Sequence, residues 1–443
     1  MKTAILGGGL TGLTLARLLS LTGEEVVVLE KEEKYGGLCR SKTEDGFTFD
    51  IGGSHIIFSR DTEVNDFMRE VLRENKDTRN RNTKIFFKGN YVKYPFENGL
   101  YQLPAEDRFF CINEFIKTLI AHEKGELKDP ENFREWIYLT FGKGIAESYM
   151  VPYNEKIWNF PTEKMSHHWV DGRIPRPPVE DIIKSAIGIE TEGYTHQSVF
   201  TYPVNGGIEA LTQAIAEPVL SKIRTGFCVE SVRENKDGEG FVISDGKEDI
   251  ICSRVINTLP LQVLLPCLEN IPDDIKTACN DLKYNSIACV GIGVEGELSD
   301  ISWLYVPQTE LGKFNRISFP SNYSTEVAPK GCSSVLAEIT YNEGDDVSKM
   351  TDEELIDHVT EGLIKMDIIT DKNLVRYSTV ERFEFAYVVY DTEYQKNIKT
   401  VREYVEALNI DLVGRFSEFE YINMDGCIRH VLNYIENRYK NQE

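Results

Sequence analysis

Three glycines near the amino terminus have the spacing of a phosphate-binding turn. Gly7, Gly9 and Gly12 follow an apolar run at residues 4–6 and precede a segment whose leucines repeat at helical spacing. Gly7 permits a tight turn, Gly9 lets backbone amides approach a pyrophosphate, and Gly12 lets the helix pack closely against the strand. Glu30 ends a second apolar run, where its carboxylate can hold an adenosine ribose. This order predicts a dinucleotide-binding unit.

A second glycine pair extends this signal. Residues 35–41, YGGLCRS, place the pair before Arg40, and an apolar strand at residues 47–51 then leads into Gly52 and Gly53. This tandem resembles the FAD-binding amino terminus of the amine oxidase and protoporphyrinogen oxidase superfamily, in which the arginine reaches the cofactor phosphates. The resemblance favours FAD over NAD as the cofactor.

Later segments resemble the remainder of that FAD-binding domain. Residues 205–216 place a glycine pair before a helix, and residues 227–232 and 253–261 resemble return strands, with the backbone of Val229 at the adenine. A helix expected over residues 426–436 would point its amino end at the flavin pyrimidine ring and stabilise negative charge on the reduced flavin. The residues assigned to FAD are Gly7, Gly9, Thr11, Gly12, Glu30, Lys31, Gly37, Leu38, Arg40, Ser54, His55, Val229, Gly414, Arg415, Met424 and Asp425.

The composition is that of a globular protein that folds without disulfides. Of its 443 residues 41% are apolar and 27% charged, and its nine cysteines form no CxxC pair or Cys/His cluster, so we expect reduced thiols and no metal site. The net charge of −23 disfavours nucleic acid and anionic membrane as partners. No apolar run approaches the ~18 residues of a membrane span, and residues 1–6 are too short for a signal peptide, which predicts a cytoplasmic protein. Whether the protein forms a homo-oligomer stays open.

The expected fold is α/β, with a Rossmann-like FAD-binding domain split along the chain, an inserted helical domain and an antiparallel β-sheet substrate domain. Residues 105–190 contain amphipathic runs typical of helices, whereas residues 266–400 alternate short β-type runs with polar turns. We expect the FAD-binding domain at residues 1–80, 204–265 and 406–443, the sheet domain at residues 81–104, 191–203 and 266–405, and the helical domain at residues 105–190.

Residues 151–161, VPYNEKIWNFP, hold aromatic side chains between two prolines without a clear helical or strand period. We expect an ordered loop here, and large aromatic residues on an ordered loop commonly face a ligand.

A closer resemblance covers nearly the whole chain. The segments GGSHIIFS, YPFENGLYQLP, ESYMVPYNEKIWNFPTEKM, GRIPRP, VFTYPVNGG, WLYVP, FNRISFPSNYS and GRFSEFEYINMDG occur in the order and spacing of UDP-galactopyranose mutases, particularly the eukaryotic type. The resemblance implies UDP-galactose or a related UDP-sugar as the substrate.

A nucleoside diphosphate sugar offers a flat base, two phosphate charges and a polyhydroxyl ring, so its site needs aromatic faces, fixed cations and hydrogen-bonding groups. The resemblance places Tyr94 and Tyr149 on the two faces of the uracil, and Arg173 and Arg316 around the diphosphate, where guanidinium forks suit phosphate oxygens. The other substrate-side residues that it implies are Asn154 at the nucleotide, Trp158 near the sugar, Tyr305, Tyr387 and Tyr421 at the phosphates, and Gln197 on a loop that is mobile in the eukaryotic enzymes.

Single aromatic residues and arginines are more often core or solvated surface residues than ligand contacts. The matching positions lie far apart in the chain, and their joint retention favours a site. Some positions differ from the eukaryotic enzymes: Gln197 replaces an asparagine, Glu97 replaces a glutamine, and Ser54 adds a residue before the histidine. Arg81 lies near a position linked to reduction by a nicotinamide, so NAD(P)H is a candidate reductant. The sugar preference and the reductant therefore stay open.

The resemblance implies an isomerase that interconverts UDP-galactopyranose and UDP-galactofuranose. N5 of the reduced flavin attacks the anomeric carbon, with no net redox change. Arg173 and Arg316 would stabilise the departing diphosphate, and His55 would position or polarise the flavin. Two alternatives remain at this point: an FAD-dependent oxidoreductase of the amine oxidase or protoporphyrinogen oxidase type, and a non-catalytic flavoprotein that binds nucleotide sugars.

Overall fold

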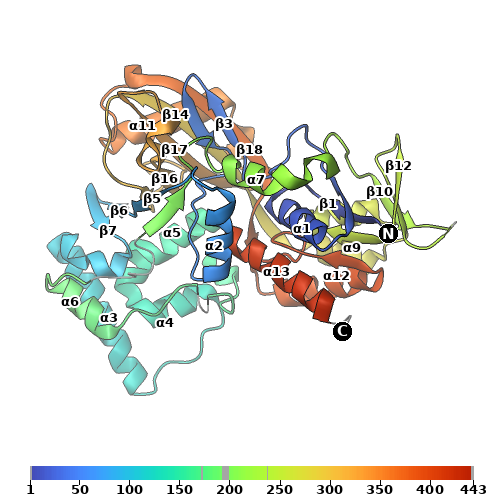
Figure 1. Ribbon diagram of the computed structural model, residues 1–443. Helices are drawn as coiled ribbons and strands as arrows, with labels where there is room; N and C mark the ends of the chain where they lie inside the picture. The colour runs from blue at the N-terminus through green and yellow to red at the C-terminus, as the bar shows by residue number, and fades with distance from the viewer. Residues whose placement is uncertain (1, 171–172, 192–198, 237, 441–443) are drawn as a thin grey trace.

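Figure 1 shows the computed structural model, which describes residues 2–170, 173–191, 199–236 and 238–440. A parallel sheet with flanking helices forms one side of the molecule, and a long antiparallel sheet and a group of helices form the other side. The expected α/β fold class is confirmed. The domain boundaries remain a prediction.

The parallel sheet brings together strands from the beginning, the middle and the end of the chain. Its order is β19-β13-β1-β2-β9, and every pair in it is parallel. The strands are β1 (Lys2–Leu6), β2 (Glu25–Leu29), β9 (Ile223–Arg224), β13 (Arg254–Asn257) and β19 (Ile410–Leu412). Their runs are largely apolar because both faces of the sheet are buried, as is usual for parallel sheets. Helices α1 (Leu10–Leu21) and α13 (Met424–Lys440) pack together on this sheet.

The antiparallel sheet forms the second layer and has seven strands in the order β18-β14-β17-β16-β15-β6-β7. All of its neighbours are antiparallel except β15 and β6, which are parallel. Its strands are β6 (Thr83–Phe87), β7 (Asn90–Lys93), β14 (Lys283–Glu295), β15 (Trp303–Tyr305), β16 (Arg316–Ser318), β17 (Cys332–Tyr341) and β18 (Val375–Val389). Smaller sheets are β10 (Ser231–Glu234) with β11 (Phe241–Ser244) and β12 (Asp249–Cys252), β3 (Ser41–Glu44) with β4 (Phe47–Asp50), and β5 (Asp77–Asn80) with β8 (Val199–Tyr202).

The remaining helices surround these sheets. They are α2 (Thr62–Val71), α3 (Ala105–Glu123), α4 (Phe133–Ile145), α5 (Val151–Trp158), α6 (Val179–Ala186), α7 (Glu209–Ala216), α8 (Leu261–Leu264), α9 (Asp273–Asn280), α10 (Asp346–Lys349), α11 (Asp352–Lys365) and α12 (Tyr394–Ala407). Helices α3 to α6 form the helical part at the lower left of Figure 1. No helix among the described residues is both long and apolar enough to cross a membrane.

The expected loop at residues 151–161 is wrong, because Val151–Trp158 form helix α5. A π-helical turn, Ala146–Met150, leads into this helix from α4. Pro152 lies in the first turn of α5, where a missing N–H is tolerated. Asn159 ends the helix in the left-handed conformation, with φ of 44°. The prolines therefore lie near the ends of a short helix rather than bounding a loop.

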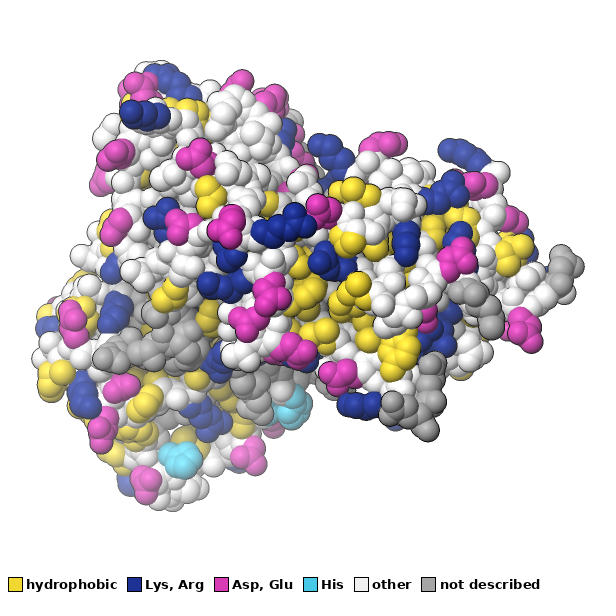
Figure 2. Space-filling model, in the orientation of Figure 1, with side chains coloured by type: hydrophobic (Ala, Val, Ile, Leu, Met, Phe, Trp, Pro, Cys, Tyr) yellow, Lys and Arg dark blue, Asp and Glu magenta, His cyan; other side chains and the backbone are white. Residues whose placement is uncertain are grey.

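Two other boundaries also differ from expectation. The return strand expected at residues 227–232 begins only at Ser231, because the preceding residues are extended without strand pairing. The carboxyl-terminal helix begins at Met424, two residues earlier than expected, and continues to Lys440. On the face drawn in Figure 2, basic side chains are interspersed with acidic ones and do not form a single basic patch.

Candidate active site

The glycine turn between β1 and α1 has the geometry of a phosphate cradle. Gly9 is the N-cap of α1 and no side chain caps the helix, so the first-turn amides are open to an anion. A Cβ atom on Gly9 would meet only the Cα of Gly37, at 3.9 Å, whereas a Cβ atom on Gly12 would lie 2.0 Å from the carbonyl oxygen of Gly7. The backbone thus leaves room for a ligand at Gly9 and none at Gly12.

Glu30 lies beside this turn as predicted. Its Oε2 accepts a hydrogen bond from the Gly8 amide at 2.8 Å, and its Oε1 accepts one from the Glu32 amide at 2.9 Å. A carboxylate has further lone pairs, so Glu30 can still accept hydrogen bonds from ribose hydroxyls.

These geometries predict different outcomes for two alanine variants. Gly9→Ala is expected to leave the apoprotein stability within about 0.5 kcal/mol and to lower the FAD content, because its methyl group occupies the phosphate space. Gly12→Ala is expected to destabilise the apoprotein by about 1–3 kcal/mol, because the methyl group overlaps the backbone. Denaturant unfolding of apoprotein and flavin absorbance after reconstitution measure the two effects. Equal FAD content in Gly9→Ala and wild type would contradict the cradle.

The second glycine pair packs directly on the first turn. The amide of Gly36 donates to the carbonyl of Gly8 at 2.7 Å, and a Cβ atom on Gly37 would lie 3.0 Å from the Cα of Gly9. Arg40 Nε donates to the carbonyl of Gly37 at 3.1 Å, which places its guanidinium beside the cradle.

Of the remaining residues predicted at the adenine end and the phosphate cradle, Leu38 and Val229 contact other parts of the chain and Lys31 is exposed. Leu38 packs against Gly52, and the carbonyl of Val229 accepts a hydrogen bond from Cys267 Sγ at 3.3 Å. The side chain of Lys31 is 65% exposed and pairs with Glu32 at 3.7 Å, so it faces solvent here.

The carboxyl-terminal segment closes the other end of the expected cofactor site. A Cβ atom on Gly414 would meet the side chain of Thr11 at 2.7 Å, so Gly414 lies against the start of α1. Asp425, in the first turn of α13, accepts a hydrogen bond from the hydroxyl of Ser59 at 2.7 Å, and Met424 is buried at the first position of the helix. This places the amino end of α13 beside the loop that follows His55.

Arg415 is oriented by backbone carbonyls. Its guanidinium donates to the carbonyl of Ala386 at 2.6 Å and to that of Ile422, and it lies 5.1 Å from the ring centre of Tyr421 and 5.4 Å from that of Tyr387. Its Nε is buried and has no hydrogen-bond partner among the described residues. An unpaired buried donor is costly in free energy, so this atom indicates a position for a ligand acceptor.

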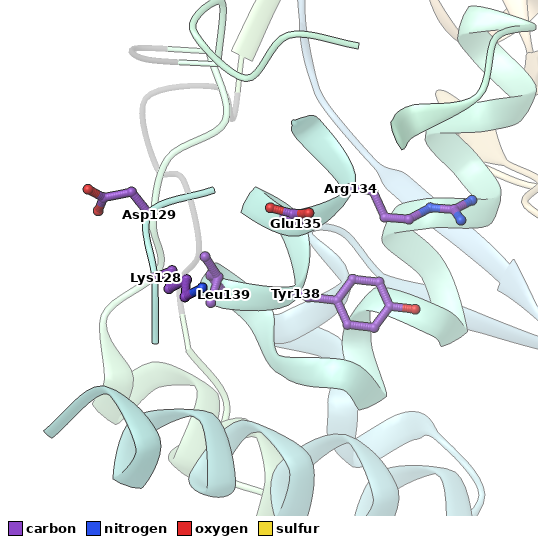
Figure 3. Close-up of a pocket in the computed structure, with 6 residues that line it drawn as sticks. All are labelled: Lys128, Asp129, Arg134, Glu135, Tyr138 and Leu139. Atoms are coloured by element: carbon purple, nitrogen blue, oxygen red, sulfur yellow. The ribbon is translucent and has the colours of Figure 1, made fainter. Parts of the chain in front are cut away.

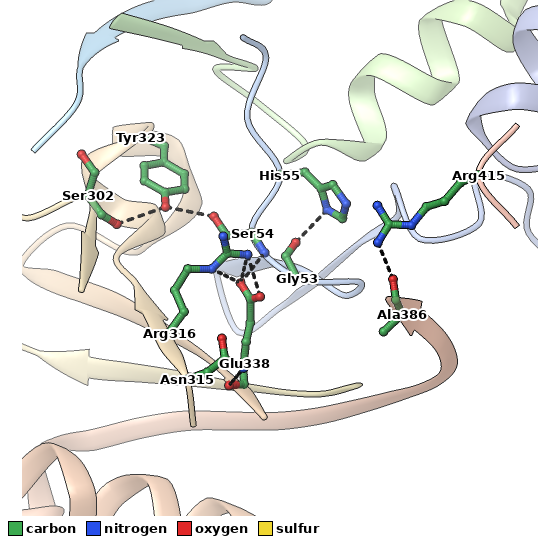
Figure 4. A network of polar contacts seen from close by, with 10 residues as sticks. All are labelled: Gly53, Ser54, His55, Ser302, Asn315, Arg316, Tyr323, Glu338, Ala386 and Arg415. Carbon is green, nitrogen blue, oxygen red and sulfur yellow. Dashed lines mark hydrogen bonds and ion pairs between the residues drawn. The ribbon is translucent and has the colours of Figure 1, made fainter. Parts of the chain in front are cut away.

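Arg316 and Glu338 form the most buried ion pair of the site (Figure 4). Arg316 donates to Oε1 of Glu338 from Nε at 3.0 Å and from one terminal nitrogen at 2.7 Å, and this nitrogen also contacts Oε2 at 2.6 Å. The Glu338 side chain is 1% exposed and that of Arg316 is 21% exposed. Burial lowers the pKa of Arg316, but the charge and hydrogen bonds of Glu338, together with Tyr387 and Tyr305, outweigh burial and hold the pKa well above its usual value.

The same carboxylate fixes the loop that carries His55. Oε1 of Glu338 accepts the Ser54 amide at 3.0 Å, and the Ser54 hydroxyl lies 2.9 Å from the hydroxyl of Tyr323. His55 Nδ1 lies 2.8 Å from the carbonyl of Gly53 (Figure 4). Burial lowers the pKa of His55 to about 4, so the imidazole is neutral, donates from Nδ1 and offers Nε2 as an acceptor.

The predicted uracil-binding tyrosines lie in an aromatic row. Tyr149 is 4% exposed and stacks between Phe96, at 5.0 Å, and Tyr153, at 5.3 Å. Tyr305 lies 5.2 Å from Tyr94 and 5.1 Å from Tyr153. Tyr94 and Tyr149 therefore lie near Tyr305 and Tyr153, but both faces of Tyr149 already contact protein rings. The sandwich of uracil between Tyr94 and Tyr149 stays a prediction.

A second aromatic group holds the residues predicted at the sugar and the phosphates. The Tyr387 and Tyr421 rings lie 5.8 Å apart, and Trp158 contacts both, at 6.0 Å and 5.0 Å. Arg173 is exposed and lies 4.9 Å over the ring of Tyr421. Tyr387 also interacts electrostatically with Arg316. Arg173 thus lies over Tyr421, and Arg316 is close enough to Tyr387 for their charges to interact.

Asn154 uses both ends of its amide inside helix α5. Its Nδ2 donates to the carbonyl of Met150 at 2.7 Å, and its Oδ1 accepts from Trp158 Nε1 at 3.2 Å. Its predicted hydrogen bond to the nucleotide would use the remaining donor and acceptor capacity. Gln197 lies outside the described residues.

Comparison with known proteins agrees with this arrangement. Residues 10–396 match the family described as flavin containing amine oxidoreductase. The chain belongs to this family. The match covers most of the chain, including the second glycine pair and the antiparallel sheet.

Particular members of this amine oxidoreductase superfamily are similar to the chain over different lengths. A crystal structure of a reduced UDP-galactopyranose mutase has 27% identity and a TM-score of 0.87, covering 98% of this chain and 96% of that one. The dTDP-fucopyranose mutase of Escherichia coli is 24% identical over 219 residues, which are 46% of this chain and 54% of that protein. The chain thus matches about half the length of that curated relative. A putative protoporphyrinogen oxidase from Exiguobacterium sp. 255-15 shares the fold, with 19% identity, a TM-score of 0.76 and coverage of 98% of each chain.

Glu338, which orients Arg316 and the His55 loop, was not among the residues predicted from the sequence. Glu338 lies in SSVLAEITY, where a single acid interrupts an apolar strand, and a buried acid in such a strand needs a partner. Tyr153 was also left out of the predicted ligand set, although it lies one helical turn after Tyr149. Recognition of the helix would have placed both rings on one face.

Two surface hollows lie outside the predicted site. Figure 3 shows one of about 410 Å³ on α4, and the six residues drawn there include none of the predicted site residues. Arg134, one of these six residues, pairs with Glu155 in the middle of helix α5. A larger groove, of about 1090 Å³, lies between α5 and the turn that follows β15.

Proposed function

We propose that the chain is a flavin-dependent isomerase of the UDP-galactopyranose mutase type, which binds FAD and interconverts UDP-galactopyranose and UDP-galactofuranose without net redox change. The observation that carries the proposal is the pair of arginines beside the expected flavin site, with Arg173 over Tyr421 and Arg316 close to Tyr387. Two guanidinium groups suit a diphosphate, whereas an oxidase pocket for an apolar substrate has no use for them. The likeness to a UDP-galactopyranose mutase over nearly the full length supports the same conclusion.

Some residues of the chain fit the cofactor, and others act on the diphosphate of the substrate. The open amides of α1, the glycine cradle and the unpaired Nε of Arg415 suit an anionic dinucleotide. When bound and reduced, the flavin supplies the nucleophile for the anomeric carbon. Arg173 and Arg316 stabilise the charge that develops on the diphosphate as the sugar bond breaks, and they retain the diphosphate for its return. Neutral His55 presents Nε2 as a hydrogen-bond acceptor beside the cofactor and takes no charge.

The reaction is tested by incubating reduced holoenzyme with UDP-galactopyranose and, in parallel, with dTDP-fucopyranose. Anaerobic chromatography of the products is expected to show the furanose form of the UDP-sugar. Preferential conversion of the dTDP-sugar, as the name of the Escherichia coli relative suggests, would keep the reaction class and change the substrate. No furanose from either sugar would contradict the proposal. NAD(P)H stays a candidate reductant.

Stacking of the base gives a separate expectation. Tyr94→Ala is expected to weaken UDP binding by about 1–3 kcal/mol, the range for loss of a base-stacking ring. Tyr149→Ala is also expected to weaken UDP binding, because Tyr149 packs between Phe96 and Tyr153 and supports the neighbouring rings. Tyr149 is buried, so Tyr149→Phe serves as the variant that keeps the ring and should retain affinity. Tyr91, 39% exposed on edge strand β7, offers a control away from the site. Calorimetry that finds unchanged UDP affinity in both alanine variants would remove these rings from the binding site.

A further inference from the structure

The turn between β15 and β16, residues 306–315, connects two residues of the proposed site. Tyr305 precedes it and contacts Tyr94, and Arg316 follows it and pairs with Glu338. The outer side of this turn lines the groove of about 1090 Å³ behind α5. Lys156 of α5 lines the same groove and contacts the turn there. We refer to residues 306–315 as the β15–β16 turn.

Lys156 contacts both ends of the turn. Its Nζ donates to the carbonyls of Val306, at 2.9 Å, and Gln308, at 2.8 Å. The same Nζ lies 5.6 Å from the ring centre of Phe314, near the other end. Within the described residues no carboxylate lies within ion-pair distance of it. Its charge is therefore compensated by carbonyl dipoles and an aromatic face, which makes these hydrogen bonds charge-assisted.

Helix α5 connects this lysine to the opposite side of the site. Tyr153 and Trp158 on α5 belong to the aromatic groups described above, while Lys156 points to the β15–β16 turn. The carbonyl of Lys156 also accepts the Thr340 hydroxyl of β17 at 2.8 Å. Helix α5 thus joins the two aromatic groups to the turn that lies between Tyr305 and Arg316.

We propose that Lys156 is a positioning residue, which holds the β15–β16 turn against α5 and thereby sets Tyr305 and Arg316 for the diphosphate of a nucleotide ligand. This role rests on the proposed function only for the identity of the ligand. The contacts themselves predict that the turn loses order when the ammonium group is lost.

The charge of Lys156 changes close to neutral pH. Burial lowers its pKa to about 7, although Glu310 on the turn opposes the shift. The other charged or titratable groups around the groove are Lys88 after β6, Asp107 on α3, Glu147 on the π-helical turn, Glu155 on α5, Lys313 on the turn, Asp345 and Asp346 at the start of α10, and His358 on α11. Burial lowers the pKa of His358 below its usual value, so this ring is already neutral where Lys156 titrates. Lys156 therefore holds the turn more firmly below pH 7 than above it.

The experiment measures UDP affinity of oxidised holoenzyme by calorimetry at about pH 6 and about pH 8.5, which span this titration. Between the lower and the higher pH, the wild type is expected to lose more UDP affinity than the Lys156 variants lose. Lys156→Met is expected to bind about tenfold more weakly at the lower pH and to show no loss from lysine titration. Lys156→Arg cannot lose its proton and should remove the loss at high pH. The UDP phosphate titrates in the same way in every measurement, so its effect cancels when the wild type is compared with the variants.

Lys313→Met provides the matched control. Lys313 lies on the same turn and its Nζ pairs with Asp346 at 3.6 Å, but its side chain is 44% exposed. An exposed ion pair of this kind contributes little to stability, so Lys313→Met should bind UDP as the wild type does. Amide hydrogen exchange is expected to be faster across residues 306–315 in Lys156→Met and unchanged in Lys313→Met.

The outcomes separate this role from the proposed function. If Lys156→Met shows wild-type UDP affinity at both pH values and unchanged exchange, the positioning role is overturned. If Lys156→Met does not fold, a Lys156→Arg protein that weakens with pH as the wild type does overturns it. If the wild type binds no UDP, the proposed ligand is wrong, and faster exchange in Lys156→Met alone decides whether the lysine holds the turn.

Discussion

Replacing Arg316 with alanine is expected to lower kcat/KM for the UDP-sugar by about a hundredfold to a thousandfold, or ~2–4 kcal/mol of transition-state stabilisation. The guanidinium is held by Glu338 through three short contacts, so it needs no reorganisation when charge develops on the diphosphate. Arg316→Lys is expected to recover only part of the loss, because a lysine cannot reproduce the planar fork. The FAD content should stay unchanged, since Arg316 lies on the substrate side.

The same variant should also lose stability. Arg316→Ala leaves the Glu338 carboxylate, which is 1% exposed, without its counter-ion. Removing one partner of a buried ion pair costs about 3–5 kcal/mol. Arg376→Ala breaks an exposed pair with Glu295 on the same sheet and should cost only about 0–1 kcal/mol. Denaturant unfolding compares the two variants, and steady-state kinetics well below the unfolding transition isolates the effect on turnover. Wild-type turnover in Arg316→Ala would show that this arginine does not serve the diphosphate.

The backbone geometry expected for the cofactor half was largely predictable because it is local. The tight turn at Gly7, the close approach at Gly12 and the acid at Glu30 lie within one strand-turn-helix-strand unit, and each reflects a backbone or hydrogen-bond requirement of that unit. The amino end of α13 was also predicted, with an error of two residues at its start. Such features need no knowledge of distant contacts.

The substrate half depends on contacts between distant segments, which periodicity does not reveal. The α5 helix contains only eight residues and a proline, so its apolar positions repeat too few times to show a helical period. Glu338 becomes functional only because β17 places it beside Arg316 on β16 and Ser54 on a loop 284 residues earlier in the chain. Lys156 likewise gains a role only when the β15–β16 turn folds over it. Tertiary pairing, rather than residue type, assigns these side chains.

Reduced enzyme is expected to convert UDP-galactofuranose to UDP-galactopyranose over many turnovers after a single reduction, whereas oxidised enzyme is expected to be inert. The reduced ring has an electron pair available for the anomeric carbon, and the electron-poor oxidised ring does not. The measurement is anaerobic chromatography of the nucleotide sugars after one treatment with dithionite, beside an untreated control. The two preparations should differ by more than any single side-chain variant, since one lacks the nucleophile altogether.

The stoichiometry of this experiment distinguishes an isomerase from an oxidoreductase. In an isomerisation the electrons remain on the cofactor, so product should exceed flavin many-fold without consumption of reductant or oxygen. An oxidase or dehydrogenase would use one acceptor for each product and could begin from the oxidised state. The amino end of α13, where Ser59 donates to Asp425 beside the His55 loop, would favour the reduced form, because a helix amino terminus stabilises negative charge. Equal conversion by oxidised enzyme, or product limited to one per flavin, would contradict the isomerase and return the chain to the redox chemistry that its family also contains.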